Sequence, residues 1–413
     1  MANVLKGACI FGQSGGPTAV INASAYGVFR TALDRPEITR VLGAKNGITG
    51  VLHDRMYDMG EEDAQELNRL LYTPAAELGS CRYKLADPET DDSDYLRLLE
   101  IFRKYDVRYF FYNGGNDSMD TCAKISRYMQ KAGYECRVMG VPKTIDNDLW
   151  GCDHCPGYGS AAKYITVSCM EVAKDTSVYD TGMVTVIEIM GRHAGWLAGA
   201  AGLATKFGSG PDLIYLPEVD FDMERFLADV DRVYAEKKKV FVAVSEGIRY
   251  ADGTFVSARG PSLADGFGHV QLGGLATTLA HTVKAHNGAK VRGIELSLLQ
   301  RAAAHLASQT DIDEAFLVGK TAVECAVAGE TDKMVGLVRE TNGGAYRCTT
   351  ELVPLSNVAN QERKVPRSWI NEAGNQVTDA FIDYVLPLIQ GEPKLPLECS
   401  LPRYARLKKV FAK

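Results

Sequence analysis

The sequence contains no apolar run that approaches the ~20 residues a membrane-spanning helix requires, and residues 1–6 include no long apolar segment typical of signal peptides. It also has no excess of basic residues, because 46 Lys and Arg stand against 52 Asp and Glu and give a net charge of −6. A general nucleic-acid-binding surface needs a positive field. We therefore expect a cytoplasmic protein that binds neither nucleic acid nor membranes.

The ten cysteines lack the spacing of a disulfide framework, so we expect reduced thiols. One C-x-x-C motif, Cys152-Asp153-His154-Cys155, is present. A zinc site would need two further ligands at matching spacing, and the sequence has no second C-x-x-C. We interpret Cys152 and Cys155 as loop thiols, with metal or redox use as the alternative.

What the sequence does contain is a regular alternation of strands and helices. Strands are predicted at Val4–Phe11, Val107–Tyr112, Arg137–Val141, Met183–Met190, Asp212–Leu216, Val240–Ser245 and Ile294–Leu299, and helices at Pro17–Leu33, Ser118–Lys131, Ser160–Lys174, Ala194–Ala204 and Met223–Glu236. Repeated strand–turn–helix units predict an α/β fold with a mainly parallel sheet covered on both faces. Ligands in such folds bind beyond the carboxyl ends of the strands, so the turns there are the candidate site.

Two of these turns are candidate anion sites. Gly12–Pro17 follows a strand and opens a helix, where glycines let the backbone approach an anion and the helix N-terminus supplies N–H groups. It is neither a Walker A motif nor G-x-G-x-x-G. Asn113–Ser118 adds a carboxylate, Asp117, which could hold a magnesium-bound phosphate. The alternatives are a tight glycine connection at the first turn and a helix cap at the second.

The turn Pro142–Asp148 carries the densest set of reactive groups. Asp146 and Asp148 lie two residues apart, so in an extended chain both face one side. Phosphoryl transfer to an alcohol needs a carboxylate to accept the hydroxyl proton, a metal and cations over the phosphates. This turn contains the carboxylates and a cation, Lys143. The alternative is a polar turn rich in Asp and Asn.

Further charged residues stand at later turns. Arg192 and Glu246 follow two predicted strands, and Arg292 and Arg301 flank the apolar segment Ile294–Leu299. An arginine can bind a phosphate through two hydrogen bonds, and a glutamate can accept sugar hydroxyls. An isolated surface charge is more commonly solvated or ion-paired, so these roles depend on the turns described above.

Taken in order, these turns resemble the 6-phosphofructokinase family over roughly residues 3–340. The matching motifs are Gly12–Pro17, Leu78–Arg82, Gly114–Ser118, Pro142–Asp148, Ile189–Gly195, Ser245–Gly247 and Arg292–Arg301. The resemblance implies two Rossmann-like lobes, each a three-layer α/β arrangement with a mainly parallel sheet. It also implies transfer of a phosphoryl group to the 1-hydroxyl of fructose 6-phosphate, within glycolysis or gluconeogenesis.

The resemblance further implies a division of the chain. The phosphoryl-donor lobe would comprise 1–157 plus 300–340, and the fructose-6-phosphate lobe 158–299 plus 341–390. Residues 391–413 would form a loosely attached C-terminal tail. An active site shared between subunits implies a homodimer or homotetramer.

Roles for single residues follow from the same resemblance. Asp146 resembles the base that takes the 1-hydroxyl proton, Thr144 would touch the transferred phosphate, and Asp148 would lie near a Mg²⁺ ion held by Asn116 and Asp117. The residues that would bind substrates are Met190, Gly191, Arg192 and Glu246 for the sugar, Arg292 and Arg301 for its 6-phosphate (one of them across a subunit interface), and Gly15 and Arg82 for the donor.

The donor can be predicted from two positions. ATP-using members typically have glycine where this sequence has Asp117 and Lys143, whereas pyrophosphate-using members typically have aspartate and lysine there. The side chain and charge of Asp117 would repel a nucleotide α-phosphate, and Lys143 can neutralise the terminal phosphate of pyrophosphate. We therefore predict a reversible pyrophosphate-dependent enzyme. An ATP-dependent 6-phosphofructokinase is the alternative, since some ATP-using relatives carry the lysine.

Three residues depart from the family pattern and motivate an alternative of another class. Asn116 replaces an aspartate, Leu298 replaces a histidine or tyrosine near the 6-phosphate, and Met183 replaces a basic residue. These changes would suit a non-catalytic regulatory subunit that binds sugar phosphate, but the intact Asp146, Asp148 and Arg192 argue against it. A Rossmann dehydrogenase is disfavoured because G-x-G-x-x-G does not follow the first strand.

Asp146→Ala should lower turnover by about 10²–10⁴-fold, the usual contribution of a general base. The measurement is steady-state turnover of the purified variant beside the wild type. A turnover close to that of the wild type would show that Asp146 is not the base.

Overall fold

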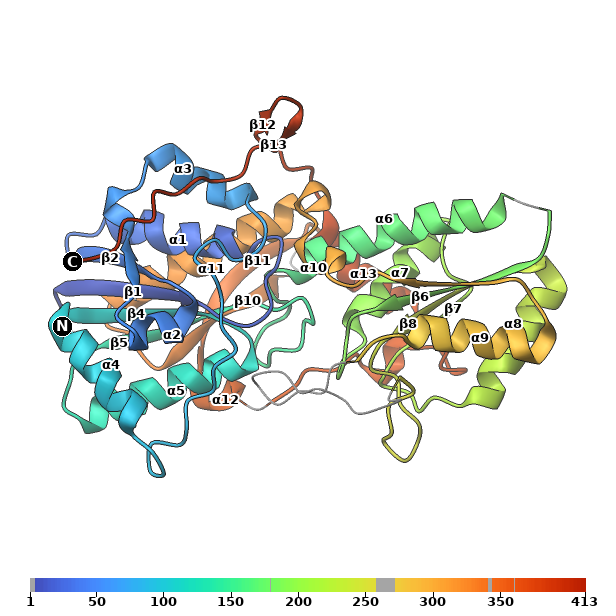
Figure 1. Cartoon of the computed structure of the whole chain (residues 1–413), viewed down its shortest axis with the longest axis horizontal. Helices are drawn as coiled ribbons and strands as arrows, with labels where there is room; N and C mark the ends of the chain where they lie inside the picture. Colours follow the sequence, from blue (N-terminus) through green and yellow to red (C-terminus); the bar gives the residue numbers. More distant parts are fainter. Residues whose placement is uncertain (1–3, 179, 258–271, 341–343, 360) are drawn as a thin grey trace.

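The computed structural model describes residues 4–178, 180–257, 272–340, 344–359 and 361–413. These form two lobes that lie side by side (Figure 1), each built on its own sheet. The larger sheet has the order β11-β10-β5-β4-β1-β2-β3, with β1 (Gly7–Gln13), β2 (Ile38–Ala44), β3 (Met56–Asp58), β4 (Val107–Gly114), β5 (Arg137–Pro142), β10 (Lys333–Glu340) and β11 (Arg347–Pro354). Its edge strands β3 and β11 are antiparallel to their neighbours, and the other pairings are parallel.

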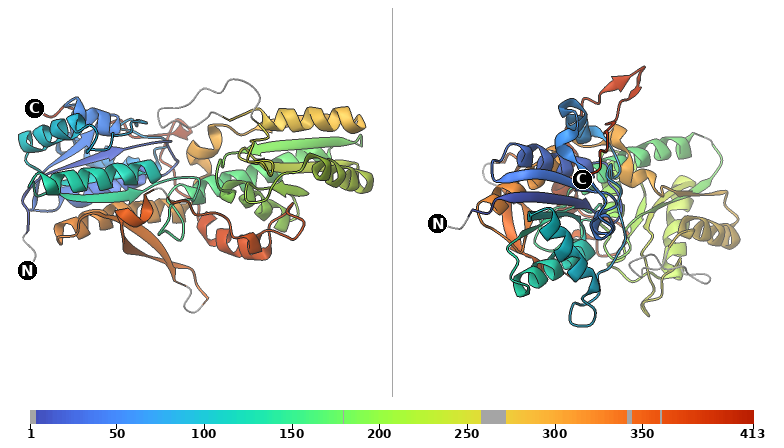
Figure 2. Two further views of the ribbon diagram at one scale, coloured as in Figure 1. Left: turned by 90° about the horizontal axis from the view of Figure 1, so that it is seen from below. Right: turned by 60° about the vertical axis from the view of Figure 1, so that its left-hand side comes forward.

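The smaller sheet is parallel throughout and has the order β7-β8-β6-β9. Its strands are β6 (Met183–Ile189), β7 (Leu213–Tyr215), β8 (Lys239–Ser245) and β9 (Val291–Glu295). A short hairpin of β12 (Leu397–Glu398) and β13 (Leu401–Pro402) projects from the larger lobe, as Figure 2 also shows. The predicted α/β class with mainly parallel sheets is confirmed.

Helices cover both sheets. They are α1 (Ile21–Leu33), α2 (Gly47–Leu52), α3 (Ala64–Arg69), α4 (Ser93–Lys104), α5 (Asn116–Lys131), α6 (Tyr158–Ser177), α7 (Trp196–Lys206), α8 (Met223–Lys237), α9 (Leu275–Asn287), α10 (Leu299–Ala302), α11 (Gln309–Val327), α12 (Leu355–Val358) and α13 (Asp379–Val385). Among the residues that the structure describes, no helix is long and apolar enough to cross a bilayer.

The three-layer arrangement follows from alternation along the central strands. Ile10 of β1 and Phe110 of β4 enter a core shared with α4 and α5, whereas their neighbours Phe11 and Phe111 enter a second core with α1 and α11. Successive strand residues point to opposite faces, so two apolar faces require two covering layers. The near-continuous apolar character of these strands is thereby explained.

One predicted strand is displaced. Ile294–Leu299 was expected to be extended, but β9 spans Val291–Glu295, where it pairs with β6 in parallel. The chain then turns at Ser297, whose φ is 46°, and enters α10. The register with β6 therefore determines where this strand begins, and the apolar side chains that follow belong to the turn and helix.

The chain division differs from the expectation in the C-terminal quarter. Residues 341–390 were assigned to the second lobe, yet β11 pairs with β10 at the edge of the larger sheet. By contrast, α13 packs on α7 in the smaller lobe, where Phe381 lies in the same core as Trp196. The segment therefore contributes to both lobes.

The C-terminal tail, residues 391–413, is anchored rather than loosely attached. The carboxylate of Glu62 accepts hydrogen bonds from the backbone N–H groups of Lys408 and Lys409, each at 2.7 Å. Glu62 lies between β3 and α3 of the larger lobe. The tail is therefore fixed to the larger lobe by backbone hydrogen bonds.

Candidate active site

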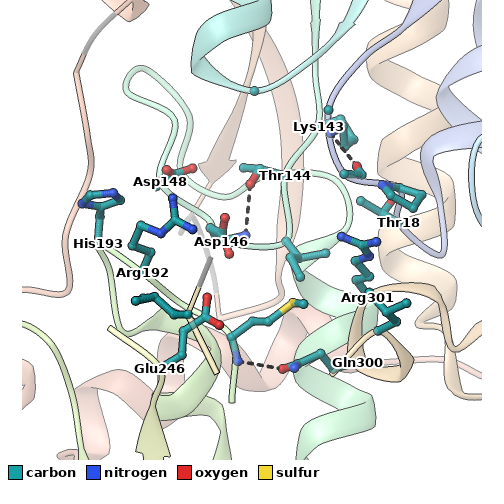
Figure 3. Close-up of a pocket in the computed structure, with 18 of the residues that line it drawn as sticks. Thr18, Lys143, Thr144, Asp146, Asp148, Arg192, His193, Glu246, Gln300 and Arg301 are labelled. Atoms are coloured by element: carbon teal, nitrogen blue, oxygen red, sulfur yellow. Dashed lines mark hydrogen bonds between the residues drawn. The ribbon is translucent and has the colours of Figure 1, made fainter. Parts of the chain in front are cut away.

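A cavity of about 910 Å³ lies where the lobes meet, at the carboxyl ends of their parallel strands. Figure 3 shows side chains from both lobes directed into it. The predicted site residues that line it are Gly15, Arg82, Asn116, Asp117, Lys143, Thr144, Asp146, Asp148, Met190, Arg192, Glu246 and Arg301. Gly191 and Arg292 of the predicted set are not among the lining residues.

The turn after β5 places two carboxylates in the cavity wall. Asp146 donates its backbone N–H to the Thr144 hydroxyl at 3.1 Å, and the next residue, Asn147, has a φ of 55°. Burial raises the pKa of Asp146, although Lys143 and Arg192 oppose the rise. A carboxylate whose pKa is raised is a better proton acceptor near neutral pH than an ordinary aspartate.

Three cations converge on the first glycine turn. Lys143 Nζ donates to the backbone oxygen of Gly16 at 2.7 Å, and a Cβ added to Gly15 would lie 3.2 Å from the same nitrogen. A Cβ added to Gly16 would lie 3.4 Å from Arg301 Nη1 and 3.8 Å from Arg82 Nη2. Gly15 has a φ of 74°, which a side chain would also disfavour. The turn therefore leaves an open space surrounded by positive charge.

The charges in this space act on one another. Burial lowers the pKa of Lys143 to about 8; Asp146 opposes this shift, and Arg82 and Arg301 add to it. Burial and Arg82 likewise lower the pKa of Arg301. Such an assembly binds an anion strongly, because a bound anion relieves the repulsion among the cations.

The start of α5 supplies oxygen ligands beside this space. Asn116 Oδ1 is buried and has no hydrogen-bond partner among the residues that the structure describes. Asp117 is in the first turn of the helix, and both side chains line the cavity. Amide and carboxylate oxygens are ligands that Mg²⁺ accepts, so this corner fits a divalent metal.

The smaller lobe completes the cavity with groups suited to a polyhydroxylated ligand. Met190 donates its N–H to Gln300 Oε1 at 3.0 Å, and Gly191 donates its N–H to Glu246 Oε1 at 3.4 Å. Burial and then the charge of Asp146 raise the pKa of Glu246 to about 7. In Figure 3, Arg192 lies beside Asp146, and Glu246 and Gln300 lie below it.

Arg292 lies elsewhere in this chain. It is on β9, outside the cavity lining, and forms an exposed ion pair with Asp175 at 2.6 Å. Leu298 lies at the cavity and is 58% exposed, whereas Met183 is buried at the amino end of β6. Within one chain, only Arg301 of the predicted arginine pair therefore reaches the cavity.

Several lining residues were not predicted as site residues from the sequence, among them Gln300 and Glu362. Gln300 precedes Arg301, so its position in that motif could have indicated it, whereas Glu362 lies in the segment that the resemblance does not cover. Glu362 Oε1 lies 3.8 Å from His193 Nδ1. Cavity residues that come from this distant segment carry no local sequence signal.

The C-x-x-C loop lies outside the cavity. All ten cysteines are free, and Cys152 and Cys155 are buried in the core of the larger lobe. His154 lies 3.0 Å from Asp153 and 2.7 Å from Glu314. Burial lowers the pKa of His154, but hydrogen bonds with Asp153, Cys348 and Glu314 raise it well above its ordinary value. His154 therefore joins Asp153 and Glu314 in a buried hydrogen-bond network.

Comparison with known proteins gives consistent results. The sequence model of the family described as "Phosphofructokinase" matches residues 9–326. A pyrophosphate–fructose 6-phosphate 1-phosphotransferase of Halomonas elongata is 46% identical over 403 residues, which cover 97% of this chain and 96% of that protein. Solved structures of pyrophosphate-dependent phosphofructokinases from Nitrosospira multiformis and Marinobacter aquaeolei superpose with TM-scores of 0.89 and 0.88. Both are 41% identical and cover 99% of this chain and 98% of theirs.

The carboxylate of Asp148 should make stability depend on pH. Burial, Asp146 and Glu362 raise its pKa to about 7, whereas an unfolded aspartate has a pKa of about 3.9. Its stabilising contribution is then complete below about pH 4 and lost as the pH rises through about 7. Asp148→Asn should therefore gain thermal stability relative to the wild type between about pH 5 and about pH 8, while turnover falls.

The measurement is the midpoint of thermal unfolding at several pH values, with the exposed Asp383→Asn as the matched control. A difference between Asp148→Asn and the wild type that does not change with pH would contradict this interpretation.

Proposed function

Because this chain belongs to the phosphofructokinase family, we propose that it transfers a phosphoryl group from pyrophosphate to the 1-hydroxyl of fructose 6-phosphate. The products are fructose 1,6-bisphosphate and phosphate, and the reaction runs in both directions, serving glycolysis and gluconeogenesis. The observation that carries the proposal is the convergence of Lys143, Arg82 and Arg301 on the Gly15–Gly16 turn, beside Asp146.

Asp146 is the general base of this reaction. Its raised pKa suits proton abstraction from the sugar 1-hydroxyl, and its place in the cavity wall lies between the cationic turn and the sugar-binding lobe. The three cations stabilise the charge on the phosphoryl group as it leaves one oxygen and joins another. Thr144, which lines the cavity beside them, contacts the transferred group.

The metal of this reaction is Mg²⁺, held by Asn116 and Asp117 with Asp148 nearby. The unpartnered oxygen of Asn116 supports this assignment. When bound, the ion neutralises phosphate oxygens and orients the donor. The loss of one formal charge at Asn116, relative to the aspartate usual in the family, is offset by Asp117, which lines the same cavity.

Pyrophosphate is the donor because the charges fit it and disfavour a nucleotide. Three cations adjoin the glycine turn, which suits the compact, densely charged pyrophosphate anion. Asp117 places a further negative charge in the cavity wall, where the α-phosphate of a nucleotide would be repelled. A donor with several negative charges would stabilise the ammonium form of Lys143, which burial disfavours.

The active form is a homodimer or homotetramer with its sites at subunit interfaces, in the cytoplasm. β9 is an edge strand of the smaller sheet, and Arg292 projects from it into solvent. An exposed edge strand is available for contact with another chain, and such a contact would bring Arg292 to a neighbouring sugar 6-phosphate. The ten free cysteines suit a reducing compartment.

Purified protein with Mg²⁺ and fructose 6-phosphate should form fructose 1,6-bisphosphate with pyrophosphate and not with ATP, because the cationic turn fits the smaller anion. The readout is coupled detection of the bisphosphate. Omission of fructose 6-phosphate is the control for simple pyrophosphate hydrolysis. Turnover with ATP and none with pyrophosphate would overturn the donor assignment, and turnover with neither would overturn the function.

A further inference from the structure

The catalytic turn is braced by residues that lie beyond the family match at 9–326. Arg363 donates its backbone N–H to the backbone oxygen of Asp148 at 2.8 Å, and Glu362 forms a β-bridge with Leu149. Tyr384 of α13 reaches the same turn through its hydroxyl. We propose that Tyr384 is a positioning residue that fixes the backbone between Asp146 and Asp148 for phosphoryl transfer; this rests on the function proposed above.

The Tyr384 hydroxyl uses its full hydrogen-bonding capacity. It accepts from Asn147 Nδ2 at 2.9 Å and from Arg363 Nη1 at 3.2 Å, and it donates to the backbone oxygen of Asp153 at 2.6 Å. A tyrosine hydroxyl offers one donor, and its oxygen can accept further hydrogen bonds. Three partners from three segments therefore hold this oxygen in one place.

Asn147 transmits that constraint to the catalytic carboxylates. Its side chain is fully buried, donates to Tyr384 and accepts from the Cys155 backbone N–H at 2.9 Å. Its φ of 55° lies in the left-handed region, which asparagine adopts more readily than most non-glycine residues. This conformation sets the directions in which Asp146 and Asp148 leave the turn.

The ring of Tyr384 is held by residues of both lobes. The guanidinium groups of Arg339, on β10 of the larger sheet, and of Arg363 lie 4.6 and 5.3 Å from the ring centre. The rings of Trp196 and Trp369 each lie 5.2 Å from it, and Trp196 opens α7. The hydroxyl therefore fixes the catalytic turn, which belongs to the larger lobe, relative to the lobe that presents Arg192 and Glu246.

Tyr384→Phe should lower kcat about 10- to 10²-fold, because small misplacements of reacting groups have effects of this size. KM for fructose 6-phosphate and for pyrophosphate should stay within about two-fold, since the substituted hydroxyl lies outside the cavity and the substrate-binding side chains are unchanged. Tyr109→Phe is the matched control. Tyr109 is buried like Tyr384, and its hydroxyl donates to the Leu5 carbonyl at 2.6 Å. Removal of this hydroxyl should leave kcat unchanged.

A double-mutant cycle separates positioning from general destabilisation. Asn147→Gly keeps the left-handed conformation accessible and removes the amide. On that background Tyr384→Phe should lower kcat by no more than about two-fold, because the two residues act through one contact. An equal loss of kcat on both backgrounds, or a Tyr384→Phe variant as active as Tyr109→Phe, would overturn the proposal. A wild-type protein inactive with pyrophosphate would instead refute the proposed function.

Discussion

The site depends on a buried ammonium group held among other charges. Lys143 Nζ is fixed by its hydrogen bond to Gly16, and burial with two neighbouring arginines disfavours its charge. A buried cation needs anionic partners, and Lys143 has two nearby carboxylates, Asp146 and Asp148, opposed by the charges of Arg82 and Arg301. The donor completes the neutralisation. The mutually repelling side chains, Arg82, Lys143 and Arg301, come from three segments that only the folded chain brings together. The fold itself therefore favours a small, highly charged anion.

The two-lobe architecture explains why the charges are divided. The cations and the proposed metal ligands follow strands of the larger sheet, and the proposed sugar-binding groups follow strands of the smaller one. Catalysis then requires the lobes to keep a fixed relation. Asp311 at the start of α11 contributes to this, since its carboxylate accepts from the backbone N–H groups of Gly157 and Ser160 at 2.8 and 2.9 Å. The Tyr384 hydroxyl, which accepts a hydrogen bond from Asn147 in the turn after β5, also helps to keep the lobes in this relation.

The sequence predicted the parts of this arrangement that depend on local rules. The turns around Gly15, Asp117 and Asp146 were identifiable because glycine, charge and strand periodicity occur within a few residues, and parallel strands bring their carboxyl ends to one edge. Contacts between distant segments were not identifiable. Glu362 and Tyr384 meet the catalytic turn only in the folded chain, and β11 and the C-terminal tail were misplaced for the same reason.

The reverse reaction tests the assignment of pyrophosphate as donor most directly, because the enzyme must then use inorganic phosphate as the phosphoryl acceptor. The purified protein, given fructose 1,6-bisphosphate, Mg²⁺ and inorganic phosphate without any nucleotide, should form fructose 6-phosphate and pyrophosphate in equal amounts. Neither should appear when phosphate is omitted. Formation of fructose 6-phosphate only when ADP is supplied, or without any phosphate acceptor, would contradict a site built around pyrophosphate.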